Sequence, residues 1–155
     1  MKKPKLVKTD LDVTIMELVG KTDKKTLVIW ACDCAERVLP YFEKKYPRDL
    51  RPRLAIEAGR AWVRTGVFRM ADIRRASLVA HAAAREVPED DPAHSAARAA
   101  GQAAAAAHVG THAVAAAIYA ATAIRDLGGG STADAATIKE RHWQYQHLLD
   151  LIDNT

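Results

Sequence analysis

The sequence is poor in cysteine. Its 155 residues include only two, Cys32 and Cys34. Residues two apart on a helix point roughly 200° away from each other, so these thiols can neither form a disulfide together nor chelate one metal ion together. We therefore expect two small buried thiols in a reducing compartment.

Long apolar runs are also missing. The longest stretch of the alanine-rich region without a charged residue or histidine covers residues 113–124, and a membrane-spanning helix needs roughly 20 apolar residues. Acidic residues (Asp10, Asp12 and Glu17) follow the basic start of the chain where a signal peptide requires its apolar segment. These absences predict a cytoplasmic protein without a membrane partner.

The residue sets of common catalytic sites are absent. There is no nucleophile elbow and no pair of catalytic carboxylates. The glycine run 128–130 lacks the lysine and the spacing of a phosphate-binding loop, so we interpret it as a linker. The sequence predicts no enzymatic activity and no cofactor.

Two histidines, His108 and His112, are weak candidates for a metal site because side chains four residues apart can share one helix face. Gly110 between them predicts a break in the helix, and no carboxylate lies within ten residues on either side. We expect these histidines to bond backbone groups around a turn instead, and no metal to be bound.

Positive charge is unevenly distributed. The formal net charge is +4, and four lysines (Lys2, Lys3, Lys5 and Lys8) stand in the first eight residues, where there is no acid. The remaining 19 bases equal the 19 acids, so the body of the protein is neutral. A basic nucleic-acid-binding body should carry its surplus on a folded face, which makes nucleic acid an unlikely partner. We expect residues 1–8 to form a basic, disordered tail and residues 9–155 to form a single domain.

Alanine is what the sequence has in excess. It occurs 31 times, and 16 of these fall among the 28 residues 96–123. Alanine has the best helix propensity and a poor strand preference, which predicts an all-α protein. Caps, glycines and prolines divide the chain into about seven helices: 10–19, 24–46 with a kink or break at Pro40, 49–65, 68–86, 92–108, 111–126 and one from 131 onward. Their apolar stripes predict Trp30, Trp62, Leu78 and Ile138 as core residues.

A weak internal repeat leaves two arrangements of these helices open. Ala55, Ala58, Gly59 and Ala61 recur 42 residues later as Ala97, Ala100, Gly101 and Ala103. An offset of that size suits helical hairpins stacked in a short superhelical array. A helical bundle with small-residue seams explains the same pattern equally well.

An arginine-rich middle is the main candidate for a binding surface. Residues 48–75 hold eight arginines against Asp49, Glu57 and Asp72. Arginine suits bidentate contacts at interfaces, although local pairs from Glu57 to Arg60 and Arg64 would leave only a solvated face. The residues that we select as partner-binding candidates are Arg60, Arg64, Arg74, Arg75 and, from the polar side of the last helix, Trp143.

Several stretches together resemble a known family. They are Trp30-Ala-Cys-Asp-Cys-Ala-Glu-Arg-Val-Leu, Arg53-Leu-Ala-Ile-Glu-Ala-Gly-Arg-Ala-Trp-Val-Arg, Ala99-Ala-Gly-Gln-Ala, His108-Val-Gly-Thr-His-Ala and Glu140-Arg-His-Trp-Gln-Tyr. They are similar to the small helical immunity proteins of bacterial polymorphic toxin systems. The resemblance implies a binder that occupies and neutralises a cognate toxin domain, and it supplies no active site.

Two other function classes stay open at this point. One is a helical-repeat protein that binds or processes nucleic acid through residues 48–75, whose affinity should fall steeply with salt. The other is a metalloenzyme at His108 and His112. The sequence favours the toxin-binding immunity protein over both.

Overall fold

The computed structural model describes residues 5–155, and in this range every regular element is an α-helix. The all-α prediction is thereby confirmed. The helices are α1 (Asp12–Gly20), α2 (Lys24–Glu43), α3 (Arg51–Thr65), α4 (Met70–Arg85), α5 (Pro92–Ala105), α6 (His112–Leu127) and α7 (Gly130–Asp153). None of them is long and apolar enough to cross a membrane.

Local capping signals set several of the helix ends. The Asp23 carboxylate accepts a hydrogen bond from the Thr26 backbone N–H at 3.1 Å and starts α2, and Asp91 accepts one from the Ala93 N–H at 2.8 Å and starts α5. Gly66 ends α3 with φ +70°, a left-handed conformation that favours glycine. The predictions of these three ends are confirmed.

The starts of α1, α6 and α7 have no side-chain N-cap. At α1 the carboxylate of Asp12, in the first turn, accepts hydrogen bonds from the N–H and hydroxyl of Thr9. α6 begins at His112 and α7 at Gly130, each within one residue of its predicted start. Pro40 lies inside a continuous α2, where only its own hydrogen bond is lost and buried neighbours hold the helix.

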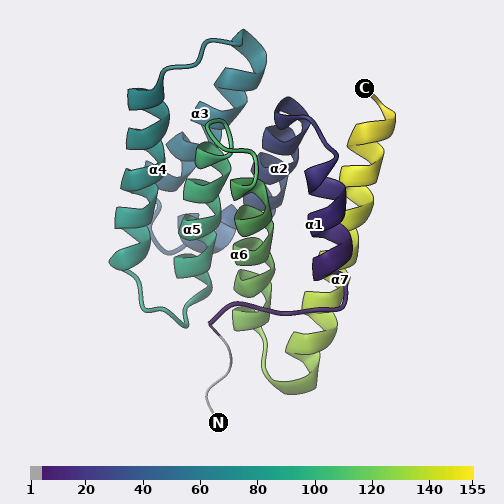
Figure 1. Cartoon of the computed structure of the whole chain (residues 1–155). Coiled ribbons are helices and arrows are strands. Elements are labelled where there is room, and N and C mark those ends of the chain that lie inside the picture. Colours follow the sequence, from purple (N-terminus) through teal and green to yellow (C-terminus); the bar gives the residue numbers. More distant parts are fainter. Residues whose placement is uncertain (1–4) are drawn as a thin grey trace.

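The helices pack as a bundle, one of the two arrangements that the sequence left open. From α2 to α7 each helix contacts the next one in sequence, and α7 packs back against α2 to close the ring. In Figure 1, α4, α5 and α6 stand side by side with α2 and α3 behind them. The two glycines of the weak repeat face different neighbours, since Gly59 lies against Cys32 of α2 and Gly101 against His81 of α4.

Alanine allows α5 to sit at the centre. This helix contacts α2, α3, α4 and α6, so nearly all of its circumference is enclosed. Its buried side chains are correspondingly small, and most of them are alanines between Ala93 and Ala104. A helix that is apolar all round is a core helix, and small side chains let its neighbours approach closely.

Large side chains fill the remaining space of the core. Trp30, Phe42, Ile56 and Leu148 are at most 1% exposed, so the prediction for Trp30 is confirmed, while Trp62 is only half-buried. The predictions for Leu78 and Ile138 are wrong, because they are 54% and 50% exposed. On α4 the buried face is set by Ile73, Ala80 and Ala84, and Leu78 points away from it.

In Figure 1 the chain before α1 runs across the lower part of α6. Val7 is buried, and its N–H donates to the Thr122 hydroxyl of α6 at 3.2 Å. Arg125 of α6 donates to the Lys5 carbonyl at 3.2 Å. Residues 5–8 of the expected tail therefore pack on α6, whereas residues 1–4 lie outside the described residues.

Candidate partner-binding surfaces

Charged side chains from three helices meet over the outer face of α2. The members of this surface, which we name the α2 face, are Asp33, Glu36 and Arg37 of α2, Arg53 and Arg60 of α3, and Glu140, Trp143 and His147 of α7. Seven of them lie in the three sequence stretches 30–39, 53–64 and 140–145 that carry the family resemblance. The fold thus assembles segments about 100 residues apart into one surface.

On this face Arg60 is bound to α2. Its Nη1 atom lies 3.0 Å from Asp33 Oδ1, and Nη2 lies 3.5 Å from Glu36. The predicted local pairs from Glu57 to Arg60 and Arg64 do not form within residues 5–155. The sequence shows the spacing along α3, but the register of α3 against α2 decides which carboxylate a guanidinium reaches.

Trp143 also contacts side chains of the α2 face. The Arg37 guanidinium lies 3.8 Å from the Trp143 ring centroid, and the His147 ring stacks on the indole at 4.7 Å. Arg37 in turn donates two hydrogen bonds to the Glu140 carboxylate, at 2.8 and 3.0 Å, and Glu140 raises the pKa of Arg37. The indole is half-buried and packs against the core.

Beneath the α2 face lies a buried polar cluster that fastens α7. The Arg141 guanidinium donates to Gln144 Oε1 at 2.8 Å and to Asp12 Oδ1 of α1 at 2.9 Å. Gln144 donates to the Ala117 carbonyl of α6 at 2.9 Å, and its own carbonyl accepts from the Trp30 indole at 2.8 Å. These hydrogen bonds join α7 to α1, α2 and α6, which gives the cluster a structural role.

Sequence reasoning missed most of the α2 face. Asp33, Arg37, Glu140 and His147 were not selected, because each looks like an ordinary surface residue of its own helix. The available signal was the resemblance itself, since the first three stand inside the quoted stretches. Only the fold brings them within 3 Å of their partners.

A second surface runs along the outside of α4. Arg74 and Arg75 are exposed and form no ion pair within residues 5–155. Together with Met70, Leu78 and Val79 they line a shallow open hollow on this helix. Arg64, at the end of α3, is likewise exposed. The structure therefore divides the five predicted partner-binding residues between two faces.

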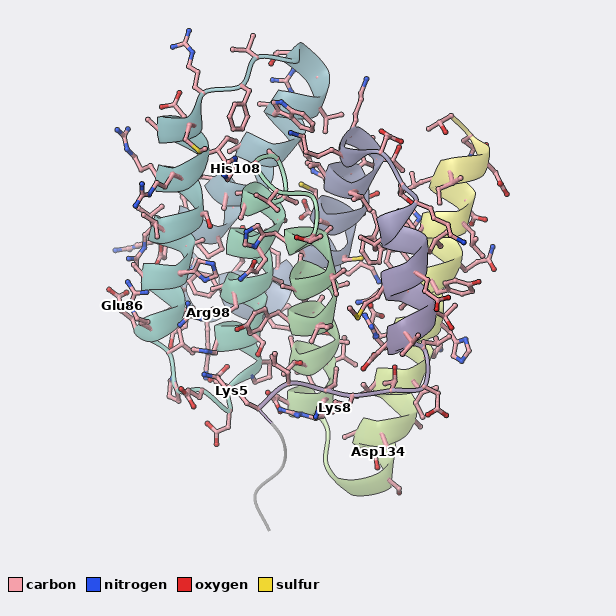
Figure 2. The ribbon with its side chains drawn as sticks, in the orientation of Figure 1. Lys5, Lys8, Glu86, Arg98, His108 and Asp134 are labelled. Carbon is pink, nitrogen blue, oxygen red and sulfur yellow. The ribbon has the colours of Figure 1, made fainter. Side chains whose placement is uncertain are left out.

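The two histidines of the candidate metal site have separate contacts. The His108 ring stacks on Phe68 with 6.1 Å between the ring centroids, whereas His112 Nδ1 lies 2.8 Å from Gln102 Oε1. Figure 2 shows His108 at the upper end of the bundle, in the turn between α5 and α6. Across the described part of the chain, no three histidine, cysteine or carboxylate side chains converge on a site for a metal ion.

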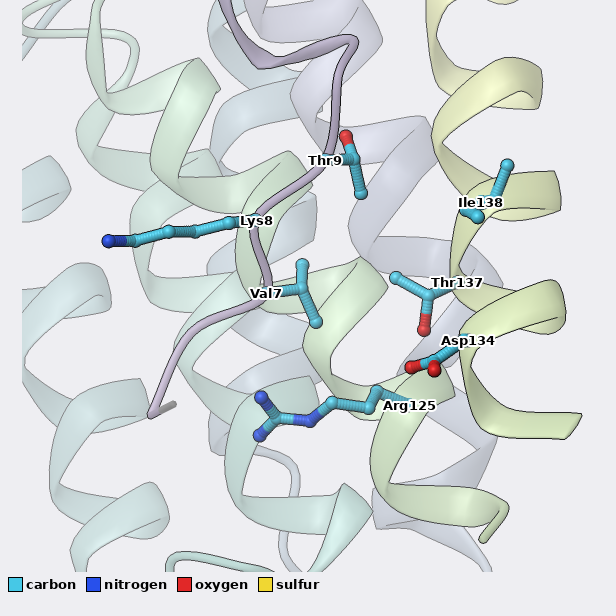
Figure 3. Close-up of a pocket in the computed structure, with 7 residues that line it drawn as sticks. All are labelled: Val7, Lys8, Thr9, Arg125, Asp134, Thr137 and Ile138. Carbon is cyan, nitrogen blue, oxygen red and sulfur yellow. The ribbon is translucent and has the colours of Figure 1, made fainter. Parts of the chain in front are cut away.

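The pocket in Figure 3 lies between residues 7–9 and the helices α6 and α7. Its volume is about 360 Å³, and Asp134, Thr137 and Ile138 form the α7 side. The Lys8 side chain extends away from the other lining residues. A single carboxylate beside a threonine offers no acid–base pair and no activated nucleophile, so the pocket suggests no reaction.

The two cysteines are shielded from reaction. Burial raises the pKa of the Cys32 thiol to about 12 and that of Cys34 well above its usual value. The thiolate is the reactive form, so neither sulfur is a nucleophile near neutral pH. Their role is to pack α2 against α3 and α7.

Comparison with protein families gives a match that covers the sequence stretches of the α2 face. Residues 17–151 match the model of the Imm5-like family, described as "Imm-5 like putative immunity protein". The chain belongs to this family. No curated protein and no solved structure matches it. Membership of this family indicates a role in immunity and, in general, a partner protein. The matched region contains all of α2 to α6, most of α7 and the whole of the α2 face.

Proposed function

We propose that this Imm5-like protein binds a cognate toxin domain in the bacterial cytoplasm and neutralises it by occupying its surface. The family match over residues 17–151 is the observation that carries the proposal. The arrangement of the polar side chains supports a binding role, because many of those in residues 5–155 hold helices together or lie exposed on the surface. Inhibition would be stoichiometric, without a cofactor or a chemical step.

The contacts that we propose follow from the two surfaces. Arg64, Arg74 and Arg75 are the stronger candidates, because their charges are exposed and have no ion pair among residues 5–155. Arg60 and Trp143 remain proposed contacts, but a partner would have to share or displace Asp33 and Arg37 to reach them. A bound guanidinium gains less from a new carboxylate than an unpaired one.

Binding to a protein suits these surfaces better than binding to nucleic acid. Five of the eight arginines in residues 48–75 have no ion pair among residues 5–155, and exposed apolar side chains lie between those at 64–75. Phosphate contacts need cations and polar donors, while a mixture of arginine, methionine and aromatic side chains is typical of protein interfaces. The family match adds weight to the same choice.

Co-expression tests the proposal. The full chain is produced with the toxin domain encoded by the neighbouring gene, and cell survival and copurification of the two proteins are measured. We expect rescue from toxicity and a stable complex. The proposed function is wrong if cells that produce the toxin domain survive without this chain. It is also wrong if the toxin domain still kills cells that produce this chain in a folded form.

A further inference from the structure

The arginines of this protein fall into two groups. Those in the first group pair with carboxylates of the chain; they are Arg37, Arg51, Arg53, Arg60, Arg125 and Arg141. The second group consists of Arg48, Arg64, Arg69, Arg74, Arg75 and Arg85, which are exposed and have no ion pair among residues 5–155, while Arg98 stands apart because it bonds to His81. Four members of the second group, Arg64, Arg69, Arg74 and Arg75, are close to one another in the sequence. They follow one another along the end of α3, the next turn and the start of α4, where Asp72 is the one acid.

Apolar side chains are exposed over the same stretch. Val67 is 58% exposed, Phe68 40%, Met70 43% and Leu78 54%. Single exposed apolar residues are common on protein surfaces, but four within twelve residues concentrate apolar surface on α4 and the turn before it. Met70 and Leu78 line one shallow hollow together with Arg74 and Arg75. We call the surface formed by Val67, Phe68, Met70, Arg74, Arg75 and Leu78 the α4 ridge.

The helix geometry aligns the two kinds of side chain. Met70, Arg74 and Leu78 are spaced four residues apart, so they form one row along the outside of α4, with Arg75 beside it. At the upper end of the row, Phe68 is fixed by stacking on His108 and by Lys24, whose Nζ lies 5.7 Å from the ring centroid. The ridge is an apolar row with cationic groups in its middle.

We propose that the α4 ridge is the docking surface for the toxin domain, and that the toxin presents acidic groups around an apolar contact there. The charge argues for this occupant, because carboxylates from a partner would supply the counter-charges that the chain itself provides to Arg51, Arg53 and Arg60 of the same region. The inference rests on the proposed function and adds to it the surface used and the chemistry of the partner.

Charge reversal on the ridge is the test. The full-length variant Arg74→Glu/Arg75→Glu is compared with the wild type in binding to the purified, catalytically inactivated toxin domain from the neighbouring gene. We expect the dissociation constant to rise at least 30-fold at 0.15 M salt, with most of the loss in the association rate. A second variant, Leu78→Ser, should weaken binding about tenfold with little dependence on salt.

A matched control reverses two exposed cations elsewhere. Lys44→Glu/Arg48→Glu changes the net charge equally at the turn between α2 and α3, and it should alter the dissociation constant less than threefold. Circular dichroism of every variant shows whether the helices are retained. If the control and the ridge variants lose binding equally, net charge alone explains the loss, and the proposal is overturned.

The remaining outcomes separate the inference from the proposed function. If the wild type neutralises the toxin and the ridge variants bind it as tightly, the proposed function stands and the ridge is the wrong surface. If the wild type does not bind the toxin, both are wrong. Ridge-dependent binding of a 24-base-pair DNA duplex without toxin binding, or a homodimer that the ridge variants dissociate, would assign the ridge to another occupant and overturn the proposal.

Discussion

The seam between α4 and α5 offers a sharp test of the packing. A Cβ atom added to Gly101 would lie 2.8 Å from His81 Nε2 and 3.0 Å from Cδ2 and Cε1 of the same ring. The ring cannot easily move, because Arg98 donates to His81 Nδ1 at 2.9 Å. Gly101→Ala therefore inserts a methyl group against a fixed ring.

Two opposing effects set the magnitude. Overpacking costs about 1–3 kcal/mol, while alanine in a helix interior is favoured over glycine by about 1 kcal/mol. In the wild type the net destabilisation should be about 0–2 kcal/mol. In the His81→Ala background the obstacle is gone, so the same substitution should stabilise by about 1 kcal/mol. The expected coupling between the two sites is thus about 1–3 kcal/mol.

Urea denaturation of the wild type, both single variants and the double variant measures this coupling. Gly20→Ala is the control, since no atom lies within 4 Å of the added Cβ and no steric cost arises there. For a chain of this size 1 kcal/mol corresponds to about 2–4 °C in Tm, so thermal scans give a second readout. Equal effects of Gly101→Ala in both backgrounds would refute the reasoning.

Three further predictions concern buried polar groups. Glu140→Gln removes the charge that receives two hydrogen bonds from Arg37, so the free energy of unfolding should fall by about 1–3 kcal/mol; an unchanged urea midpoint would contradict this. Cys32 and Cys34 should resist a thiol-specific reagent at pH 8 in the native state and react fully in denaturant, and fast native labelling would count against the burial described. Burial lowers the pKa of His81 to about 4, below its unfolded value near 6.5, so the stability gained from the neutral ring is lost as the pH falls from about 6.5 to 4. Between pH 7 and 5 the wild type should therefore lose more stability than His81→Gln, and equal losses would exclude this role.

The sequence predicts much of the helical content because helix ends are local features. Asp23, Gly66 and Asp91 act within four residues of their own positions, and their types alone indicate where a helix starts or stops. Alanine enrichment indicates a tightly packed helical interior for a similar reason. These signals require no knowledge of the neighbouring helices.

The pairing of helices and of charges could not be predicted in the same way. Arg37 reaches Glu140 across 103 positions of sequence, and Arg60 selects Asp33 rather than the nearby Glu57. Such choices depend on how two packed helices are rotated and shifted against each other. The sequence of one helix alone does not determine this arrangement. The face assignment of Leu78 failed for the same reason, since α4 packs mainly on α3 and α5 and exposes Leu78 on its outer side.

The central claim, that this chain neutralises a toxin by binding it, is tested most directly by titrating the active toxin domain with the purified protein. The account predicts that toxin activity falls linearly and reaches its floor at a fixed whole-number equivalence, with an equimolar complex the simplest case. Activity that persists in a large excess of the protein would contradict the claim. So would complete loss of activity at a small fraction of one equivalent, because that result would show catalysis instead of binding.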